Sequence, residues 1–345
     1  MEIKLFKDFK KHNLITGRGA TAIYLVFCNE NLSDIDVLVP ANVCYAAVFP
    51  VIASGNRVVF CDVDGNSGNV TLDFLKKNKT DKTRAVIAPH MYGNSVNDLS
   101  EIKEWCSIND MILIEDCASS LGGKNEKYGD LGTLGDYVIY SFGHSKIVDM
   151  GKGGILSSDR NLDKAEEILT HLPVFNDDIG KIEDELSLRY RDARYISGNY
   201  EQVKELLKNE LFLYQTDSYD ELKEMITDRE LFSHCIEEHI RNYDLYDKNV
   251  NGHLKRYRYN NGSVPWRFSL MLNVETKKVI INILLKERLP VSDWYPNVTI
   301  LFNDVKLPFE NVDIMEKELL NFPLDIDEET ILRICNKINS VAGEC

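Results

Sequence analysis

The stretch VLVPANVCYAAVFPVIASGNRVVFCDVD (residues 37–64) decides the fold, because it places a helical pattern between two short apolar runs. Both runs are rich in β-branched residues, so we predict strands over 36–40 and 57–63. Near-continuous apolar strands of this kind are buried on both faces of a parallel sheet. The stretch therefore predicts a strand–helix–strand unit. Pro50 lies inside the helical part, where proline bends or breaks a helix.

The same alternation continues on the C-terminal side of this unit. Apolar runs at 84–90, 111–116 and 137–142 predict further strands, and helical patterns separate several of them. Strands that alternate with helices indicate an α/β fold with a mostly parallel sheet flanked by helices.

Beyond residue 160 the pattern of residue types in the sequence changes. Residues 160–260 are charged and have a helical period, and a strand pattern follows at 264–273. We expect a large α/β domain over 1–230, whose segment from about 160 to 230 is helical. A small C-terminal α+β domain is expected over 231–345.

Composition limits the possible partners. The 345-residue chain has 40 Lys and Arg against 55 Asp and Glu, a formal net charge of −15. This charge argues against nucleic acid or an anionic membrane as the main partner. Residues 37–56 carry no charge, but two prolines and a Ser-Gly pair argue against a membrane span. The eight cysteines are scattered singly, and the N-terminus shows no apolar leader pattern, so we expect structural thiols and a cytoplasmic protein.

The run TGRGATAIYLVF (16–27) opens a helix with glycines and small residues. A loose turn at a helix N-terminus directs free N–H groups outward, which suits a phosphate. Similar turns also cap many helices that bind nothing. The run has neither the GK[ST] of a phosphate-binding loop nor the pattern GxGxxG.

Two runs place acidic or nucleophilic side chains at the ends of predicted strands. In MILIEDCASSLGG (111–123) a strand ends in Glu115 and Asp116, where a carboxylate can pair with a cationic ligand or cap a turn. In GDLGTLGDYVIYSFGHSKIVDMGKGGIL (129–156) a strand leads to Ser141 and then Lys146, which glycines and a serine flank. A desolvated lysine loses its proton readily and becomes an imine-forming nucleophile.

Together these motifs resemble the DegT/DnrJ/EryC1/StrS family of pyridoxal-phosphate-dependent sugar aminotransferases of fold type I. The match runs in family order through GATAIYL, the 37–64 stretch, APHMYGNSVNDLSEIKEW, ILIEDCASSLGG and GDLGTLGDYVIYSFGHSK…GKGG, and covers about residues 14–158. The segment ELLNFPLDIDEETILRICNKI resembles the family's C-terminal signature more loosely.

The resemblance implies a role for each matching residue. Lys146 falls at the lysine that forms an imine with the cofactor and later moves protons at the substrate carbon. Asp116 falls at the carboxylate that pairs with the pyridinium nitrogen. Ser141 falls at the phosphate-binding serine, beside the backbone of Ala20 and Thr21. His90 and Tyr92 match an HxYG motif that shapes the site, for which a structural turn is an equal alternative.

The sequence departs from the family pattern at several points. Ser119 stands where Gln or His packs on the cofactor ring, and Cys44 stands where an aromatic residue covers the other face, with Tyr45 adjacent. Lys152 replaces an acidic residue. The family's G-x-N-x-R segment, through which the neighbouring subunit reaches the phosphate, has only a weak counterpart in Arg194 and Asn199.

Other residues carry weaker hypotheses. His144 is two residues before Lys146 and is a candidate for proton transfer or for packing. In some relatives a histidine replaces the lysine and the enzyme becomes a dehydratase, so the lysine here favours transamination. No metal site is supported. The tryptophans at 266 and 294 are interpreted as core or interface anchors.

The resulting expectation is a homodimeric aminotransferase with sites near the interface. It would move an amino group from glutamate to a keto-sugar, most often one linked to a nucleotide. Three alternatives stay open: an aminotransferase for a smaller ketone such as a cyclitol or a phosphorylated triose, an inactive regulatory or binding relative, and a Rossmann dehydrogenase. The last lacks GxGxxG and the acidic residue that would hold a ribose.

Overall fold

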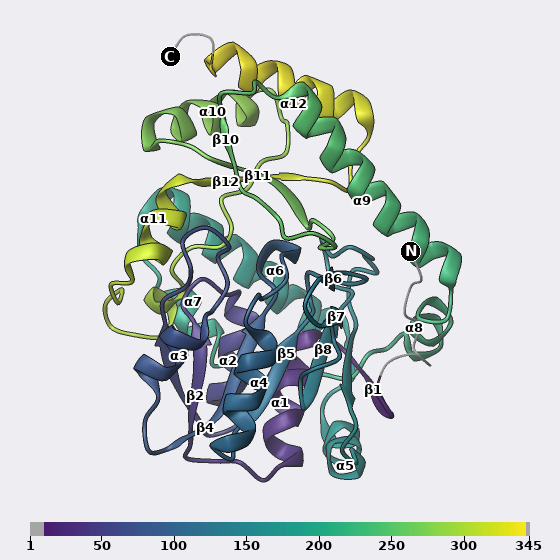
Figure 1. The fold of residues 1–345 in the computed structure, drawn as a ribbon. Helices are drawn as coiled ribbons and strands as arrows, with labels where there is room; N and C mark the ends of the chain where they lie inside the picture. Colours follow the sequence, from purple (N-terminus) through teal and green to yellow (C-terminus); the bar gives the residue numbers. More distant parts are fainter. Residues whose placement is uncertain (1–9, 343–345) are drawn as a thin grey trace.

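The computed structural model describes residues 10–342, and its fold is the expected α/β arrangement (Figure 1). The strands are β1 (His12–Thr16), β2 (Asp36–Pro40), β3 (Arg57–Cys61), β4 (Thr83–Pro89), β5 (Ile112–Asp116), β6 (Lys124–Asn125), β7 (Gly129–Asp130), β8 (Tyr137–Ser141), β9 (Gly154–Ser158), β10 (Lys255–Arg256), β11 (Arg267–Met271) and β12 (Leu319–Pro323).

The helical elements lie between and after these strands. The α-helices are α1 (Gly19–Asn29), α2 (Tyr45–Ala53), α3 (Leu72–Asn78), α4 (Leu99–Ile108), α5 (Asp163–His171), α6 (Asp177–Asp192), α7 (Glu201–Leu206), α8 (Tyr219–Met225), α9 (Arg229–Asn249), α10 (Val274–Lys286), α11 (Glu310–Glu318) and α12 (Glu328–Ala342). Short turns of other helix types are η2 (Met91–Gly93), η3 (Ala193–Ser197), η4 (Glu210–Phe212) and η5 (Val298–Leu301).

The main sheet has seven strands in the order β1-β9-β8-β5-β4-β2-β3. The five strands β3, β2, β4, β5 and β8 pair in parallel, and β9 and β1 pair antiparallel at one edge. The predicted parallel sheet is therefore confirmed. The antiparallel edge has no distinctive signal in the sequence, because β1 and β9 lack a continuous apolar run.

Helices cover both faces of this sheet. Along β4, Ala85 and Ile87 belong to the core cluster that includes α1 and α2, whereas Val86 and Ala88 belong to the cluster that includes α3 and α4. Successive side chains of a strand point to opposite faces, so an all-apolar strand requires a cover on each side. Pro50 lies within α2, and the helix continues past it to Ala53 without a break.

A smaller antiparallel sheet, β10-β11-β12, lies at the other end of the molecule with α9, α10 and α12 around it (Figure 1). Its own apolar core includes Phe268 and Phe322 from the strands and Ile334 from α12. The domain boundary near residue 230 stays a prediction. The described cysteines form no disulfide bond with one another. Among residues 10–342, none of the helices is both long and apolar enough to cross a membrane.

Candidate active site

Asp116, Ser141 and Lys146 lie at the carboxyl edge of the parallel strands. Asp116 is the last residue of β5 and Ser141 is the last residue of β8, and these strands are parallel neighbours. Parallel strands end at the same edge of a sheet, where ligands bind in open α/β folds. Lys146 lies in the turn that follows β8, and its backbone N–H donates to the Gly143 carbonyl. The chain therefore delivers an amine, a carboxylate and a hydroxyl to one edge.

Lys146 is half-buried with its amine toward a small polar cluster. Its Nζ donates to Ser119 Oγ at 3.2 Å and lies 5.8 Å from the centre of the Trp266 ring. Burial lowers the pKa of the Lys146 amine below its ordinary value, and the nearby Cys44 and Asp116 offset only part of this effect. A lysine whose neutral form is favoured is a better nucleophile and proton acceptor.

Asp116 is a carboxylate whose burial raises its pKa above the ordinary range. The hydrogen bond from the Ala118 N–H to Oδ1, at 2.9 Å, and the charge of Lys146 compensate only partly. A carboxylate in this state gains from a cationic partner, because such a partner offsets its desolvation. The residue is thus suited to receive a protonated nitrogen.

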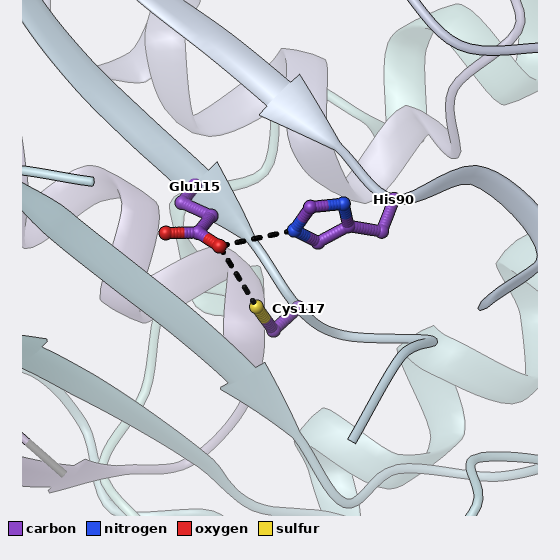
Figure 2. Close-up of side chains that lie close together, drawn as sticks. All are labelled: His90, Glu115 and Cys117. Carbon is purple, nitrogen blue, oxygen red and sulfur yellow. Dashed lines mark hydrogen bonds and ion pairs between the residues drawn. The ribbon is translucent and has the colours of Figure 1, made fainter. Parts of the chain in front are cut away.

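The neighbouring residue, Glu115, belongs to a fully buried cluster with His90 and Cys117 (Figure 2). His90 Nδ1 accepts from the Val96 N–H at 3.0 Å, so Nε2 carries the ring proton and donates to Glu115 Oε1 at 3.1 Å. The Cys117 thiol approaches the same oxygen at 4.0 Å. The residue types could hold a metal ion, but the histidine has no free lone pair for it.

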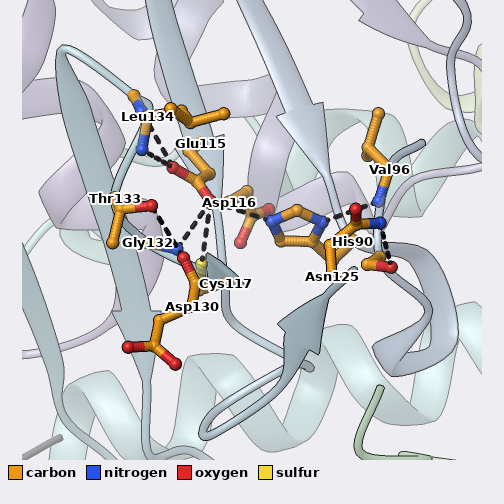
Figure 3. Close-up of polar contacts among 12 residues, drawn as sticks. His90, Val96, Glu115, Asp116, Cys117, Asn125, Asp130, Gly132, Thr133 and Leu134 are labelled. Atoms are coloured by element: carbon orange, nitrogen blue, oxygen red, sulfur yellow. Dashed lines mark hydrogen bonds and ion pairs between the residues drawn. The ribbon is translucent and has the colours of Figure 1, made fainter. Parts of the chain in front are cut away.

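Backbone groups complete the surroundings of Glu115 (Figure 3). Oε1 accepts from the Gly132 N–H at 2.6 Å, and Oε2 accepts from the N–H groups of Leu134 at 3.0 Å and Gly135 at 2.8 Å. Burial alone would raise the pKa of Glu115, but His90 and these donors outweigh it, so the pKa lies below its ordinary value. The His90 N–H also donates to the Asp116 carbonyl at 3.1 Å. These contacts fix the end of β5 and thereby the direction of Asp116.

The N-terminus of α1 faces Ser141. A β-carbon placed on Gly19 would stand 3.4 Å from Ser141 Cβ and 3.7 Å from its Oγ, so glycine leaves a small space beside the hydroxyl. The first N–H groups of a helix, here those of Ala20 and Thr21, have no acceptor inside the helix. The Thr21 hydroxyl is not part of this space, because it donates to the Tyr214 carbonyl at 3.2 Å.

The residues that depart from the family pattern have distinct surroundings. Ser119 accepts from Lys146 and also bonds the Tyr295 hydroxyl. Cys44 is the N-cap residue of α2, and Lys146, Arg18 and Asp116 act electrostatically on its thiol. Tyr45 begins α2 and its ring lies 6.0 Å from that of Tyr190.

Sequence reasoning missed the aromatic residues that stand beside Lys146. Trp266 and Tyr295 stack with their ring centres 5.5 Å apart and an interplanar angle of 14°. Both come from the C-terminal half of the chain and no motif singles out Tyr295. Tyr92 holds the pair in place, because its carbonyl accepts from the Trp266 N–H at 2.9 Å and its hydroxyl from the Tyr295 N–H at 3.2 Å.

Three predicted site residues are not gathered with the others. His144 has 87% of its side chain exposed, beside Asp149. Arg194 is bound by Asp293 at 2.7 Å and by Glu316 at 3.0 Å, so its charge is already paired. Asn199 is exposed and accepts from the Glu201 N–H at the start of α7.

The fold is that of fold type I, which solved pyridoxal-phosphate-dependent sugar aminotransferases share. PseC from Helicobacter pylori, an aminotransferase of pseudoaminic acid biosynthesis, has the same fold, with a TM-score of 0.73, 14% identity, and coverage of 97% of this chain and 88% of that one. NtdA from Bacillus subtilis, with bound cofactor PMP, matches with a TM-score of 0.66, 16% identity, and coverage of 96% and 74%.

Residues 3–191, more than half of the chain, match the DegT/DnrJ/EryC1/StrS aminotransferase family, and the protein belongs to that family. GDP-perosamine synthase of Vibrio cholerae is 31% identical over 154 residues, which are 44% of this chain and 41% of that protein. A dTDP-4-dehydro-2,3,6-trideoxy-D-glucose 4-aminotransferase of Saccharopolyspora spinosa is 37% identical over 121 residues, or 35% and 31%. The matched part spans less than half the length of these relatives.

Proposed function

We propose that this protein is a pyridoxal-phosphate-dependent aminotransferase that moves an amino group from glutamate to a keto-sugar attached to a nucleotide. The observation that carries the proposal is the meeting of Lys146 and Asp116 at one sheet edge, with burial shifting the pKa values of both. Family membership and the names of the relatives, which include two nucleotide-sugar enzymes, support it.

The residues fit pyridoxal phosphate on four counts. Lys146 offers an amine whose pKa is lowered by burial. Asp116 is a buried carboxylate suited to a protonated ring nitrogen. The space between Gly19 and Ser141, which a β-carbon would fill, lies at a helix N-terminus that favours a phosphate. The stacked pair of Trp266 and Tyr295 offers an aromatic wall near the amine.

When bound, the cofactor supplies an aldehyde and an electron-withdrawing ring. Asp116 would hold the proton on the ring nitrogen, because a buried carboxylate beside a cation stays ionised. Lys146 would accept a proton at the substrate carbon and return it to the product, with Ser119 Oγ orienting its amine. Ser141 and the N–H groups of Ala20 and Thr21 would bind the phosphate.

A second acceptor class has support of its own. L-glutamine:2-deoxy-scyllo-inosose aminotransferase of Streptomyces fradiae, whose acceptor is a cyclitol, is 30% identical over 157 residues. Assays with a nucleotide-linked keto-sugar and with a keto-cyclitol, each with glutamate and with glutamine, distinguish the two. The aminated product, identified by mass spectrometry, assigns the acceptor.

We further propose a cytoplasmic homodimer. A reducing compartment is supported by the described cysteines, which form no disulfide bond with one another. The dimer, with its sites near the interface, rests on the family resemblance alone. Sedimentation of the purified protein over a range of concentrations tests it.

The test of the cofactor assignment combines a spectrum with chemical trapping. The protein incubated with pyridoxal phosphate should develop a visible absorption band, and borohydride reduction should fix the cofactor on one lysine. Peptide mapping should find the adduct on Lys146 and not on Lys277, the other described lysine whose pKa burial lowers. Lys146→Ala should fold, lose the adduct and lose turnover. Retained turnover in that variant, or an adduct on Lys277 alone, would defeat the assignment.

A further inference from the structure

The Lys146 amine is held by a neutral hydroxyl and not by an ion pair. Its Nζ donates to Ser119 Oγ at 3.2 Å, and no carboxylate of residues 10–342 forms a salt bridge with it. Charged and titratable groups act on it from further away: Cys44 at the start of α2, Asp116 on β5 and Arg267 on β11. A carboxylate partner would stabilise only the charged amine. A hydroxyl accepts from an ammonium group and donates to a neutral amine, so it can serve both states.

A second hydroxyl continues this contact. A hydrogen bond joins the side chains of Tyr295 and Ser119, and burial raises the pKa of Tyr295 well above its ordinary value, so the phenol stays neutral. Two linked hydroxyls can reverse their direction together. When Ser119 accepts from a charged amine, its own proton is free for the Tyr295 oxygen. When Ser119 donates to a neutral amine, its oxygen is free to accept from Tyr295.

Both ends of this chain of hydroxyls are fixed to one frame. The Trp266 indole N–H donates at 2.5 Å to the carbonyl of Ser145, the residue directly before Lys146. The Trp266 ring stacks on that of Tyr295, with centres 5.5 Å apart. The Tyr295 N–H donates to the Tyr92 hydroxyl at 3.2 Å. The frame therefore holds the phenol and the loop of the amine in one fixed relation.

The middle of the chain of hydroxyls is fixed as well. The turn after β4 packs against the backbone of Ser119, since a β-carbon on Gly93 would lie 2.9 Å from the Ser119 carbonyl oxygen. Ser119 also stands where the family pattern has Gln or His. A side chain of that length would extend past the position of Oγ, toward the amine and the phenol. The short serine leaves the two groups connected through a single oxygen.

We propose that Tyr295 is a positioning residue for Lys146 and acts through Ser119, as a chain of two hydroxyls that orients the amine in both of its protonation states. The inference rests on the proposed function, in which Lys146 takes up and returns a proton. It adds a residue from the C-terminal half of the chain to that step. Tyr295 does not itself exchange a proton with the substrate.

The first test measures the reactivity of the Lys146 amine in the full chain before cofactor is added. Trace acetylation with acetic anhydride at a series of pH values, followed by peptide mass spectrometry, gives the pH at which half of the amine is reactive. Lys278, whose side chain is 62% exposed, is the internal reference. We expect this midpoint to fall by about half a pH unit in Tyr295→Phe, because the charged amine loses the stronger hydrogen-bonded chain. A midpoint equal to that of the wild type overturns the proposal.

A double-mutant cycle tests whether Tyr295 acts through Ser119. Ser119→Ala should lower the midpoint, Ser119→Thr should restore it, and Tyr295→Phe should add nothing in the Ser119→Ala background. A shift of equal size in both backgrounds would mean that Tyr295 acts by another route, which overturns the proposal. If Tyr295→Phe does not fold, as judged by circular dichroism, the Ser119 variants decide alone. Tyr295 cannot act through a hydroxyl whose removal has no effect, so an unchanged midpoint in Ser119→Ala then overturns the proposal.

A matched tyrosine serves as the control. Tyr190 is 7% exposed and stacks on Trp294 with ring centres 5.1 Å apart and an interplanar angle of 17°, much as Tyr295 stacks on Trp266. In residues 10–342 its hydroxyl makes no hydrogen bond to Ser119 or Lys146. Tyr190→Phe should keep the wild-type midpoint. A fall as large as that of Tyr295→Phe would mean that the loss of any buried phenol near the site has this effect, and the proposal would fail.

The enzyme loaded with pyridoxal phosphate gives an independent readout. In Tyr295→Phe, kcat with glutamate should fall on the order of tenfold while KM for glutamate stays at its wild-type value, because the amine is less well oriented in the proton-transfer step. An unchanged kcat overturns the proposal. If the wild type takes up no pyridoxal phosphate, the proposed function fails, whereas the acetylation profiles still decide whether Tyr295 acts on Lys146. The two failures are thus distinguishable.

Discussion

At the scale of single residues, Glu115 is the side chain whose surroundings are most completely determined. Its two oxygens accept three backbone N–H groups and His90 Nε2, and none of these partners can act as an acceptor in return. An amide nitrogen in place of Oε2 would face the N–H donors of Leu134 and Gly135 only. Glu115 therefore supports the neighbouring Asp116 through the backbone rather than by touching a ligand.

We expect Glu115→Gln to lower the free energy of unfolding by about 3 kcal/mol, because buried donors lose a charged acceptor. The wild-type pKa of Glu115 lies below its ordinary value, so its stabilising contribution is present above about pH 4.5 and is lost as the pH falls through the folded-state pKa. Urea denaturation at pH 7 and at pH 4 measures both effects, and the difference between the proteins should shrink at pH 4. Glu101→Gln, which changes an exposed carboxylate, serves as the control.

Single residues also show how far the sequence predicts the site. Lys146, Asp116 and Ser141 were predictable, because each follows a strand pattern and lies in a matching motif. Trp266 and Tyr295 were not, because an aromatic residue in the C-terminal half looks the same whether it lines a pocket or a core. Arg194 was a candidate through its weak match to the G-x-N-x-R segment, and its pairing with Asp293 depends on a tertiary contact across 99 residues.

At the scale of elements, the turn after β4 connects the two halves of the site. Gly93 has a φ of +88°, and a β-carbon on it would lie 2.2 Å from the Val264 carbonyl oxygen and 2.8 Å from the Trp266 nitrogen. This close approach brings Tyr92 against the segment of Trp266, and the Tyr92 hydroxyl also accepts from the Tyr295 N–H. The HMYG motif thus positions the aromatic wall, a role that its resemblance alone did not specify.

Gly93→Ala should therefore destabilise the protein by several kcal/mol and reduce the near-ultraviolet circular dichroism of the tryptophan environment. Gly129→Ala is the matched control, because Gly129 has a φ of +83° but open space around it. This control should cost only about 1 kcal/mol, the penalty of the backbone conformation. If Gly93→Ala and Gly129→Ala lose the same free energy of unfolding, the close contact with Val264 and Trp266 does not contribute to stability.

Some helices and strands were predictable from the sequence and the position of others was not. Every strand of the parallel core coincides with an apolar run in the sequence, because burial on both faces imposes one. The predicted helical texture of 160–260 is confirmed, with α5 to α9 in that region. Where α6 lies was not predictable, since its contacts with Arg18 and Trp294 join residues far apart in the chain.

At the scale of the whole molecule, a buried charge network joins the segment 177–214 to the C-terminal half. Arg194 bonds Asp293 and Glu316, and Lys277 Nζ donates to the Glu316 carbonyl at 2.8 Å. Burial lowers the pKa of Lys277 from 10.5 to about 8, although the Asp293 charge opposes the change. The amine is thus costly to protonate in the folded protein, beside an arginine that is always charged.

This network makes the stability of the molecule depend on pH in a definite direction. Between about pH 8 and 10.5 the unfolded chain holds a proton on Lys277 that the folded chain has lost, so the free energy of unfolding rises with pH. The full rise is about 3 kcal/mol, and Lys277→Met should abolish it. Urea denaturation of both proteins from pH 7 to 9.5 tests this. Lys278→Met, on the same helix but 62% exposed, should retain the wild-type slope. If the free energy of unfolding of the wild type and of Lys277→Met changes equally with pH, burial of the Lys277 amine does not affect stability.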